Sequence, residues 1–315
     1  MRILVTGGAG FIGAHLCKDL LTKGHEVVCL DNFVTGKKEN LGDLLKQNNF
    51  SLIIHDVCEP LPPVLGKVDL VYHLAAIASP WKYLEQKLFT LKTNIWGTYH
   101  ALEYCRANGS ALIFSSTSEV YGDPEEHPQK EEYWGHVNPI GPRACYDEGK
   151  RAAESMITNY QETYGMQCAI ARIFNTFGPQ MALDDGRPVI NFISKALRSE
   201  PLPIHGDGLQ TRSFCYVSDI MKGLQALAEK GIGKGPINIG NPDERTILSI
   251  AELVRAKVNP HAAFTHIPRV ENDPQRRCPD ITKAKTLLGW EPKVSFEEGV
   301  DRTIEWVKEL IKNQA

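Results

Sequence analysis

The glycine-rich segment TGGAGFIG at residues 6–13 most restricts the folds open to this chain. It follows an apolar run of strand length at residues 2–5 and precedes a run with helical periodicity at residues 11–23. Asp31 closes the next apolar run. This order of strand, glycine turn, helix, strand and acid predicts the first unit of a parallel sheet.

The spacing of the glycines indicates what the turn can bind. Gly7 and Gly10 can take backbone angles closed to other residues and let amides approach a pyrophosphate, and Gly13 lets the helix lie close to the sheet. Asp31 can accept hydrogen bonds from a ribose and would repel a 2′-phosphate, which favours NAD over NADP. Asp56, after a later strand, could meet the adenine edge or be a solvated turn acid. An ordinary glycine-rich turn is the alternative, but the flanking elements favour a dinucleotide site.

The remaining apolar runs of strand length alternate with helical segments. We expect strands at residues 2–5, 27–30, 51–54, 70–74, 111–114 and 167–173, and helices at 11–23, 89–108 and 146–164. Alternation of this kind is typical of a parallel sheet with helices on both faces. We therefore predict an α/β, doubly wound (Rossmann-type) domain over residues 1–177. Residues 178–315 are predicted to form mainly a smaller substrate-binding domain, with some segments returning to the sheet.

Composition and charge exclude several classes of partner. The 315 residues are 42% hydrophobic and 23% charged, with a net charge of -3 and no basic cluster, which argues against nucleic acid and membrane surfaces. The eight cysteines are scattered without metal-binding spacing, so no metal site is predicted. Because the chain starts with a strand and has no long apolar run, neither a signal peptide nor a membrane span is expected. The expected location is the cytoplasm.

A second group of residues indicates acid–base chemistry. Tyr146 and Lys150 lie four residues apart on a predicted helix and share one face, so an ammonium could stabilise the phenolate and make Tyr146 a base. The segment SSTSEVYG at residues 115–122 follows a strand end, where α/β enzymes place reacting groups. A surface pair and a helix cap are the alternative interpretations of these two patterns, but their combination favours an active site.

Longer stretches give a more specific indication. The segments at residues 116–124 and 133–151, with 171–179, 210–214, 240–244, 277–281 and 288–292, resemble the UDP-glucuronic acid decarboxylases. These belong to the extended short-chain dehydrogenases/reductases that modify nucleotide sugars, and the resemblance covers nearly the whole chain. It implies NAD as cofactor and a nucleotide-sugar substrate.

The resemblance also implies roles for individual residues. The implied catalytic residues are Thr117, Glu119, Tyr146, Lys150 and Arg277. The implied substrate-binding residues are Ser118, Glu119, Asn175, Arg212 and Arg277. The implied cofactor-binding residues are Gly7, Gly10, Phe11, Ile12, Gly13, Asp31, Asn32, Asp56, Val57, Leu74, Ala75, Ala76, Tyr146, Lys150 and Arg172. Arg212 could instead form a surface ion pair with Asp207 or Asp219.

The resemblance implies a decarboxylation that begins with oxidation at C4. Tyr146 would take the C4 hydroxyl proton while NAD takes the hydride, and Thr117 and Lys150 would steady the developing charge. Related 4,6-dehydratases would carry an Asp in place of Ser118 to protonate a departing hydroxyl. Ser118 cannot supply that proton near neutral pH, which suits a substrate whose C6 is already a carboxylate.

Three departures from the family pattern leave the exact substrate open: Ala76-Ile77, the stretch 81–89 and Gln180. The open alternatives are a nucleotide-sugar 4-epimerase or 4,6-dehydratase, a decarboxylase of another UDP- or dTDP-linked uronic acid, and a catalytically silent NAD-binding protein. Members of the family usually dimerise through the helix that carries Tyr146 and the helix before it. The apolar strip expected to serve there, or to belong to the core, is Phe89, Ile95, Trp96, Tyr99, Leu102 and Tyr104.

Overall fold

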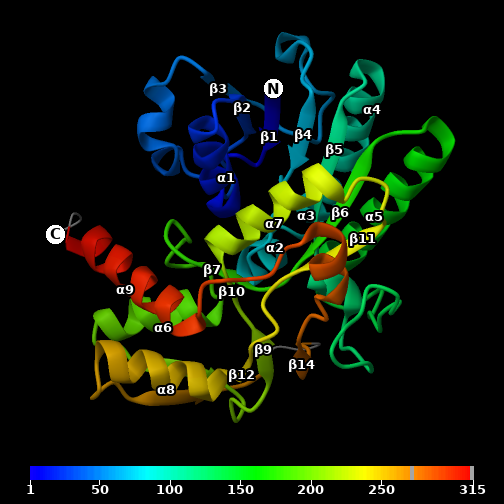
Figure 1. The fold of residues 1–315 in the computed structure, drawn as a ribbon. Coiled ribbons are helices and arrows are strands. Elements are labelled where there is room, and N and C mark those ends of the chain that lie inside the picture. The colour runs from blue at the N-terminus through cyan, green and yellow to red at the C-terminus, as the bar shows by residue number, and fades with distance from the viewer. Residues whose placement is uncertain (270–272, 313–315) are drawn as a thin grey trace.

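A seven-stranded parallel sheet forms the centre of the protein in the computed structural model, which describes residues 1–269 and 273–312 (Figure 1). Its strands, in the order β11-β6-β5-β4-β1-β2-β3, are β1 (Arg2–Thr6), β2 (Glu26–Asp31), β3 (Phe50–Ile54), β4 (Leu70–His73), β5 (Ala111–Thr117), β6 (Cys168–Ile173) and β11 (Pro236–Ile239). The chain runs outward from β1 to β3 and then returns to β4 on the other side of β1. This reversal confirms the predicted doubly wound fold and creates a crevice at the carboxyl ends of β1 and β4.

Helices cover both faces of the sheet because side chains alternate along each strand. On β1, Ile3 and Val5 belong to the core cluster under α1 (Phe11–Thr22) and α7 (Val217–Lys230). Leu4 belongs to the cluster on the other face, under α4 (Thr98–Asn108) and α5 (Ala144–Tyr164). The long helix expected at residues 89–108 is divided into α3 (Lys87–Lys92), a π-helical turn (Thr93–Gly97) and α4 (Thr98–Asn108), and α5 spans Ala144–Tyr164.

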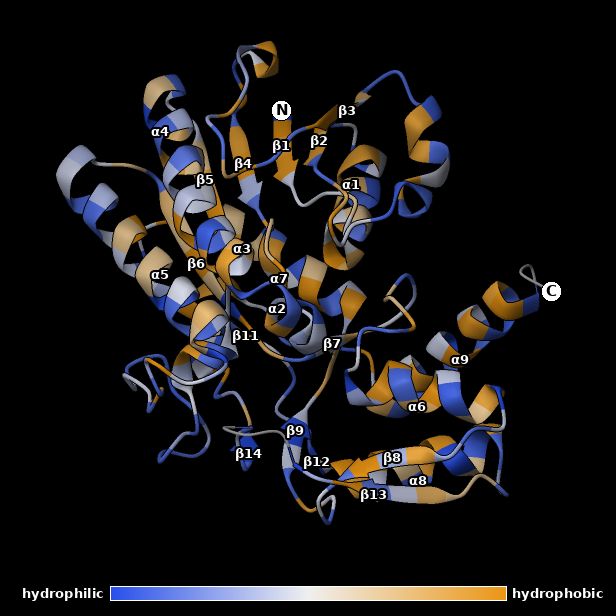
Figure 2. Ribbon diagram, turned by 180° about the vertical axis from the view of Figure 1, so that it is seen from behind, coloured by the Kyte–Doolittle hydropathy of each residue, from blue (hydrophilic) through white to orange (hydrophobic). Residues whose placement is uncertain are grey.

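A second lobe lies beyond the carboxyl ends of the strands and has its own apolar core. It is built from α6 (Pro188–Leu197), α8 (Ile247–Val258), α9 (Phe296–Lys312), β8 (Leu202–His205) and β13 (Phe264–Ile267). Figure 2 shows hydrophobic and hydrophilic colours alternating around the helices of this lobe, as expected for helices that bury one face. The buried face of α6 packs against α8 and α9.

The remaining elements of the described chain are short. They are α2 (Pro80–Glu85), the strands β7 (Thr176–Phe177), β9 (Thr211–Ser213), β10 (Cys215–Tyr216), β12 (Glu244–Thr246) and β14 (Arg276–Arg277), the 3-10 turns Lys38–Asn40, Gly42–Lys46, Pro63–Leu65 and Ser118–Tyr121, and the π turn Ala284–Leu288. In the small sheet β12-β9-β14, Arg212 on β9 is the register partner of Arg277 on β14. Two arginines far apart in the chain are thereby brought beside each other at the lobe boundary.

The part of the chain that the structure describes contains no helix with the length and apolar character needed to cross a membrane. Within the same residues, histidine, cysteine and carboxylate side chains form no group of three or more that could hold a metal ion.

Candidate active site

A cavity of about 1060 Å³ lies between the sheet and the second lobe. It opens at the carboxyl ends of β1, β2, β4 and β5, where the chain reverses across the sheet. The predicted site residues that line it are Gly7, Gly10, Phe11, Ile12, Gly13, Asp31, Asn32, Val57, Leu74, Ala75, Ala76, Thr117, Ser118, Glu119, Tyr146, Lys150, Asn175 and Arg212. The fold thus gathers most of the predicted site around one space large enough for a dinucleotide and a second ligand.

The glycine turn forms a tight cradle at one end of the cavity. Gly7 has φ +68°, and a Cβ on it would lie 2.8 Å from the backbone of Ala75. A Cβ on Gly13 would lie 2.2 Å from the Gly7 carbonyl oxygen. Gly10 caps α1 without any side-chain hydrogen bond, so the amides of the first helical turn remain available. This arrangement fits a pyrophosphate, which the amides and the positive helix end would hold.

Asp31 stands at the far side of the same cradle, at the end of β2. Its carboxylate accepts hydrogen bonds from the backbone amides of Ala9, at 3.0 Å, and Phe33, at 2.8 Å. Burial raises the pKa of this carboxyl group, and the hydrogen bonds from the backbone oppose that rise. Its remaining lone pairs can accept a hydrogen bond from a ribose hydroxyl group. The glycine cradle and Asp31 therefore both fit NAD.

Gly13→Ala should therefore empty the cofactor site. The added methyl group would clash with the Gly7 carbonyl group, and relieving this clash requires the backbone of the cradle to shift. We expect the NAD content of the purified protein to fall by at least about tenfold, with a cost in folding stability of roughly 1–3 kcal/mol. Lys18→Ala, on the exposed face of the same helix, is the control. Full NAD content in Gly13→Ala would contradict this account of the cradle.

Tyr146 and Lys150 project from α5 into the middle of the cavity. Tyr146 is 6% exposed and Lys150 is 2% exposed. The Lys150 Nζ lies 6.0 Å from the centre of the Tyr146 ring and donates a hydrogen bond to the Ser115 carbonyl oxygen at 2.8 Å. Burial raises the pKa of Tyr146 to about 12, although a hydrogen bond with Thr117 lowers it, and burial lowers the pKa of Lys150 to about 7. The buried phenol therefore needs added positive charge nearby before it can act as a base.

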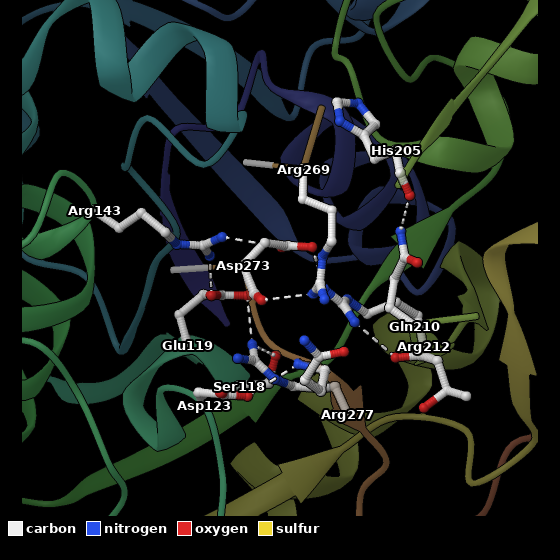
Figure 3. A network of polar contacts seen from close by, with 12 residues as sticks. Ser118, Glu119, Asp123, Arg143, His205, Gln210, Arg212, Arg269, Asp273 and Arg277 are labelled. Carbon is white, nitrogen blue, oxygen red and sulfur yellow. Dashed lines mark hydrogen bonds and ion pairs between the residues drawn. The ribbon is translucent and has the colours of Figure 1, made fainter. Parts of the chain in front are cut away.

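Glu119 follows β5 on a short 3-10 turn and lies at the centre of an ion-pair network (Figure 3). Its Oε1 is 2.5 Å from the Arg277 guanidinium, and its Oε2 pairs with Arg143. Burial alone would raise the pKa of Glu119, but the guanidinium groups of Arg143, Arg277 and Arg212 outweigh it and hold the pKa well below its usual range. Glu119 is thus a permanent anion near Tyr146, suited to orienting a ligand and unsuited to donating a proton.

Arg277 lies below the cavity surface rather than on it. It is 2% exposed, and besides Glu119 it donates hydrogen bonds to the Ser118 hydroxyl oxygen, at 3.1 Å, and the Gly122 carbonyl oxygen, at 2.6 Å. Its position below Ser118 and Glu119 lets its charge act on the cavity through them. A direct contact with a ligand would require these two side chains to move.

Asp56 and Arg172 are the other predicted residues that do not line the cavity. Asp56 accepts a hydrogen bond from the Cys58 amide at 2.9 Å, in a turn beside the cavity-lining Val57. Arg172, on β6, forms a two-bond ion pair with Glu154, at 3.0 and 2.8 Å. Its third nitrogen donates to the Tyr121 hydroxyl oxygen and a backbone carbonyl oxygen. Its contacts are therefore those of a structural residue that joins β6 to α5.

Several side chains to which the sequence pattern assigns no role lie in or beside the site. Arg143, Asp147 and Asp273 join the network around Glu119. The Tyr83 ring, 2% exposed, stacks on the Tyr146 ring with centroids 5.1 Å apart and planes 5° apart. Arg143 and Asp147 flank Tyr146 in the sequence, which was a usable signal. Tyr83 and Asp273 come from distant segments, and nothing in the local pattern marks them.

Comparison with known proteins places the whole chain in one group. The family model described as GDP-mannose 4,6 dehydratase matches residues 4–303. UDP-glucuronic acid decarboxylase 1 of Danio rerio is 52% identical over 314 residues, which cover 100% of this chain and 74% of the relative. The protein of the same name from Arabidopsis thaliana is 51% identical, covering 100% of this chain and 71% of the relative.

Solved structures agree on the fold and the cofactor. UDP-glucuronic acid 4-epimerase from Bacillus cereus, in complex with UDP-glucuronic acid and NAD, has a TM-score of 0.90 and 32% identity, covering 98% of this chain and 100% of its own. UDP-glucose 4-epimerase from Thermotoga maritima, with UDP-glucose, has a TM-score of 0.91 and 32% identity, covering 99% of this chain and 100% of its own. The chain has the glycine cradle and the Tyr146–Lys150 pair, and it is more than 50% identical to these relatives along its whole length. It therefore belongs to the UDP-glucuronic acid decarboxylases, enzymes of the extended short-chain dehydrogenase/reductase family that use NAD.

Proposed function

We propose that this enzyme converts UDP-glucuronic acid to UDP-xylose, with loss of carbon dioxide. The observation that carries the proposal is the pair of side chains, Ser118 and Glu119, that line the same cavity as Tyr146. Ser118 offers a hydroxyl group where a dehydratase needs an acid, and Glu119 is held ionised by guanidinium groups. Neither can protonate a departing C6 hydroxyl, so this pair supports a reaction that loses C6 as carbon dioxide. The 52% identity to named decarboxylases supports the same choice over the epimerases, at 32%.

The cofactor end of the cavity would hold NAD with the glycine cradle and Asp31. When bound there, NAD would supply a hydride acceptor for C4 of the sugar, and its reduced form would supply the hydride that is later returned to C4. Tyr146 would accept the C4 hydroxyl proton at its phenol oxygen, and the Thr117 hydroxyl, which hydrogen-bonds Tyr146, would keep that oxygen in place. Lys150 would favour the phenolate by its charge. The stacked ring of Tyr83 helps to fix the plane of the Tyr146 ring.

The loss of carbon dioxide follows from the position of the ketone. A carbonyl group at C4 lies β to the C6 carboxylate, so the electrons of the C5–C6 bond can move into an enolate as carbon dioxide leaves. Glu119 would orient the sugar, and Arg277, buried behind Ser118 and Glu119, would supply positive charge that favours the developing enolate. Protonation at C5 and reduction at C4 would then give the pentose. Asn175 and Arg212 would bind the diphosphate at the other wall of the cavity.

Product analysis tests the proposal. Purified enzyme incubated with UDP-glucuronic acid should release carbon dioxide and give UDP-xylose, identified by proton NMR. UDP-galacturonic acid as product would establish an epimerase, and an unchanged substrate would refute the assignment. If the substrate is unchanged, the enzyme should be incubated with a panel of UDP- and dTDP-linked uronic acids. Loss of the mass of carbon dioxide from one of them would show that another sugar is decarboxylated.

We also propose that the enzyme is a cytoplasmic homodimer. All eight cysteines are free, as expected in a reducing compartment. In the expected dimer strip, Trp96 is 48% exposed and Tyr99 is 44% exposed, whereas Leu102 is buried in the core of its own chain. The first two are therefore the candidates for contact with a second copy across α4 and α5.

Trp96→Glu should convert the dimer into a monomer. A buried, unpaired carboxylate in the interface would reduce the free energy of association by roughly several kcal/mol. Light scattering coupled to size exclusion should give half the mass of the unaltered protein. Val64→Glu, which changes another exposed apolar residue on a separate turn, should leave the mass unchanged. A monomeric unaltered protein, or a Trp96→Glu protein of unchanged mass, would argue against this interface.

A further inference from the structure

Asp273 occupies a position in the cavity that an anionic ligand would be expected to take. Its Oδ2 lies 2.8 Å from a terminal nitrogen of Arg212, and its Oδ1 lies 3.3 Å from a terminal nitrogen of Arg143. All three residues line the cavity. Figure 3 shows the Asp273 carboxylate between the two guanidinium groups, one on either side. A single carboxylate thus bridges two cations that come from β9 and from the residue before α5.

The two arginines are otherwise partly occupied by the protein. Arg212 donates its other terminal nitrogen to the Thr211 carbonyl oxygen at 2.7 Å. Arg143 pairs with Glu119 through one nitrogen, and its Nε lies 3.7 Å from Asp147. The guanidinium edges that bond Asp273 are therefore the ones that would be left for a ligand.

Asp273 differs from Glu119 in how firmly it is held. The side chain of Glu119 is 17% exposed and forms ion pairs with Arg143 and Arg277. The side chain of Arg277 is itself only 2% exposed. The Asp273 side chain is 26% exposed, and both of its arginine partners are at the cavity wall. Because its carboxylate already has more access to water, it can move away from its partners and become hydrated more readily than the carboxylate of Glu119 can.

We propose that the Asp273 carboxylate is an internal substitute for the substrate diphosphate, which must displace it from Arg212 in order to bind. The inference rests on the proposed function, since it takes the ligand to be a nucleoside diphosphate sugar. Phosphate oxygens accept the same two-bond contacts from guanidinium groups as a carboxylate does. A carboxylate left beside a diphosphate would repel it, so both cannot share Arg212 without loss of binding energy.

This arrangement has two effects on the enzyme. In the absence of ligand, Asp273 screens Arg143 and Arg212 from each other and keeps their side chains in place for the incoming anion. Its backbone is itself held, since Arg269 donates a hydrogen bond to the Asp273 carbonyl oxygen at 3.0 Å. After reaction, the same carboxylate competes with the product diphosphate and so lowers affinity for substrate and product alike. Asp273 is thus an affinity-setting residue that acts through Arg212.

Asp273→Asn tests the inference, because asparagine keeps the size and one acceptor oxygen but removes the charge. With UDP as the calorimetric probe, the variant should bind about tenfold more tightly than the unaltered enzyme. Uridine, which has no phosphate, should bind both proteins equally. Asp207→Asn is the matched control, since Asp207 is an exposed acid on the same lobe whose bond to the Leu209 amide an asparagine oxygen can keep. Its UDP affinity should change little.

The outcomes separate the inference from the function on which it rests. Weaker or unchanged UDP binding in Asp273→Asn would overturn the inference, because a purely structural role predicts a loss. An equal gain for uridine would also overturn it. If the unaltered enzyme binds no UDP, the proposed function itself fails. Asp273→Ala, which removes the bridge entirely, should also tighten UDP binding, and its melting temperature reports whether the fold survives.

Discussion

Tyr146→Phe should lower turnover of UDP-glucuronic acid by about a thousandfold and leave the bound NAD in place. The change removes only the phenol oxygen, which is the group proposed to take the C4 proton. The ring remains, so its stacking on Tyr83 and the packing of α5 are preserved. Turnover should be followed by carbon dioxide release, and NAD content by extraction and absorbance.

Tyr164→Phe is the matched control for this variant, since Tyr164 lies at the end of the same helix and is 55% exposed. It should have full activity. If Tyr146→Phe kept more than about a tenth of the activity, Tyr146 could not be the base. If the variant lost NAD as well, the loss of turnover would have to be assigned to the cofactor site instead.

Arg277→Ala should separate the first chemical step from the second. Tyr146 and Lys150 do not contact Arg277 in the structure, so C4 oxidation should persist, and reduced nicotinamide should accumulate and be visible by its near-ultraviolet absorbance. Carbon dioxide release should fall by about a hundredfold or more, because the positive charge behind Ser118 and Glu119 that favours the enolate is gone. Arg276→Ala, the exposed neighbour, should behave as the unaltered enzyme.

The same change should destabilise the protein. Removing Arg277 deprives Glu119 of one buried partner at 2.5 Å, and loss of one member of a buried ion pair costs about 3–5 kcal/mol. Chemical denaturation would measure this loss. Arg277→Lys keeps a charge at the position and should recover part of both the stability and the carbon dioxide release. Full carbon dioxide release by a folded Arg277→Ala protein would exclude a role for the arginine after oxidation.

The parts of the molecule that depend on local pattern could be predicted from the sequence. The strand, glycine turn and helix over residues 2–22 follow from hydrophobic periodicity and from backbone angles that only glycine adopts readily. The shared face of Tyr146 and Lys150 follows from the helical repeat. The main difference in the helices is the π turn Thr93–Gly97, where the predicted continuous helix gains a wider turn that hydrophobic periodicity does not encode.

The parts that depend on long-range contacts could not be predicted in this way. The partner of Arg212 is Asp273, and not the nearby acids Asp207 and Asp219, because the pairing of β9 with β14 brings residues 61 positions apart together. Arg172 was expected at the cofactor and instead pairs with Glu154 on α5. In both positions, the sequence indicates a guanidinium group that needs an anion, while only the fold determines which anion it meets.

In the proposed reaction, the sugar is oxidised and reduced again at the same carbon while the carboxylate is lost. UDP-glucuronic acid carrying deuterium at C4 tests it directly, with the product examined by NMR and mass spectrometry in ordinary water. The product should be UDP-xylose that retains the deuterium at C4 and has gained a solvent proton at C5. UDP-xylose with hydrogen at C4, formed while the cofactor stays on the enzyme, would contradict it.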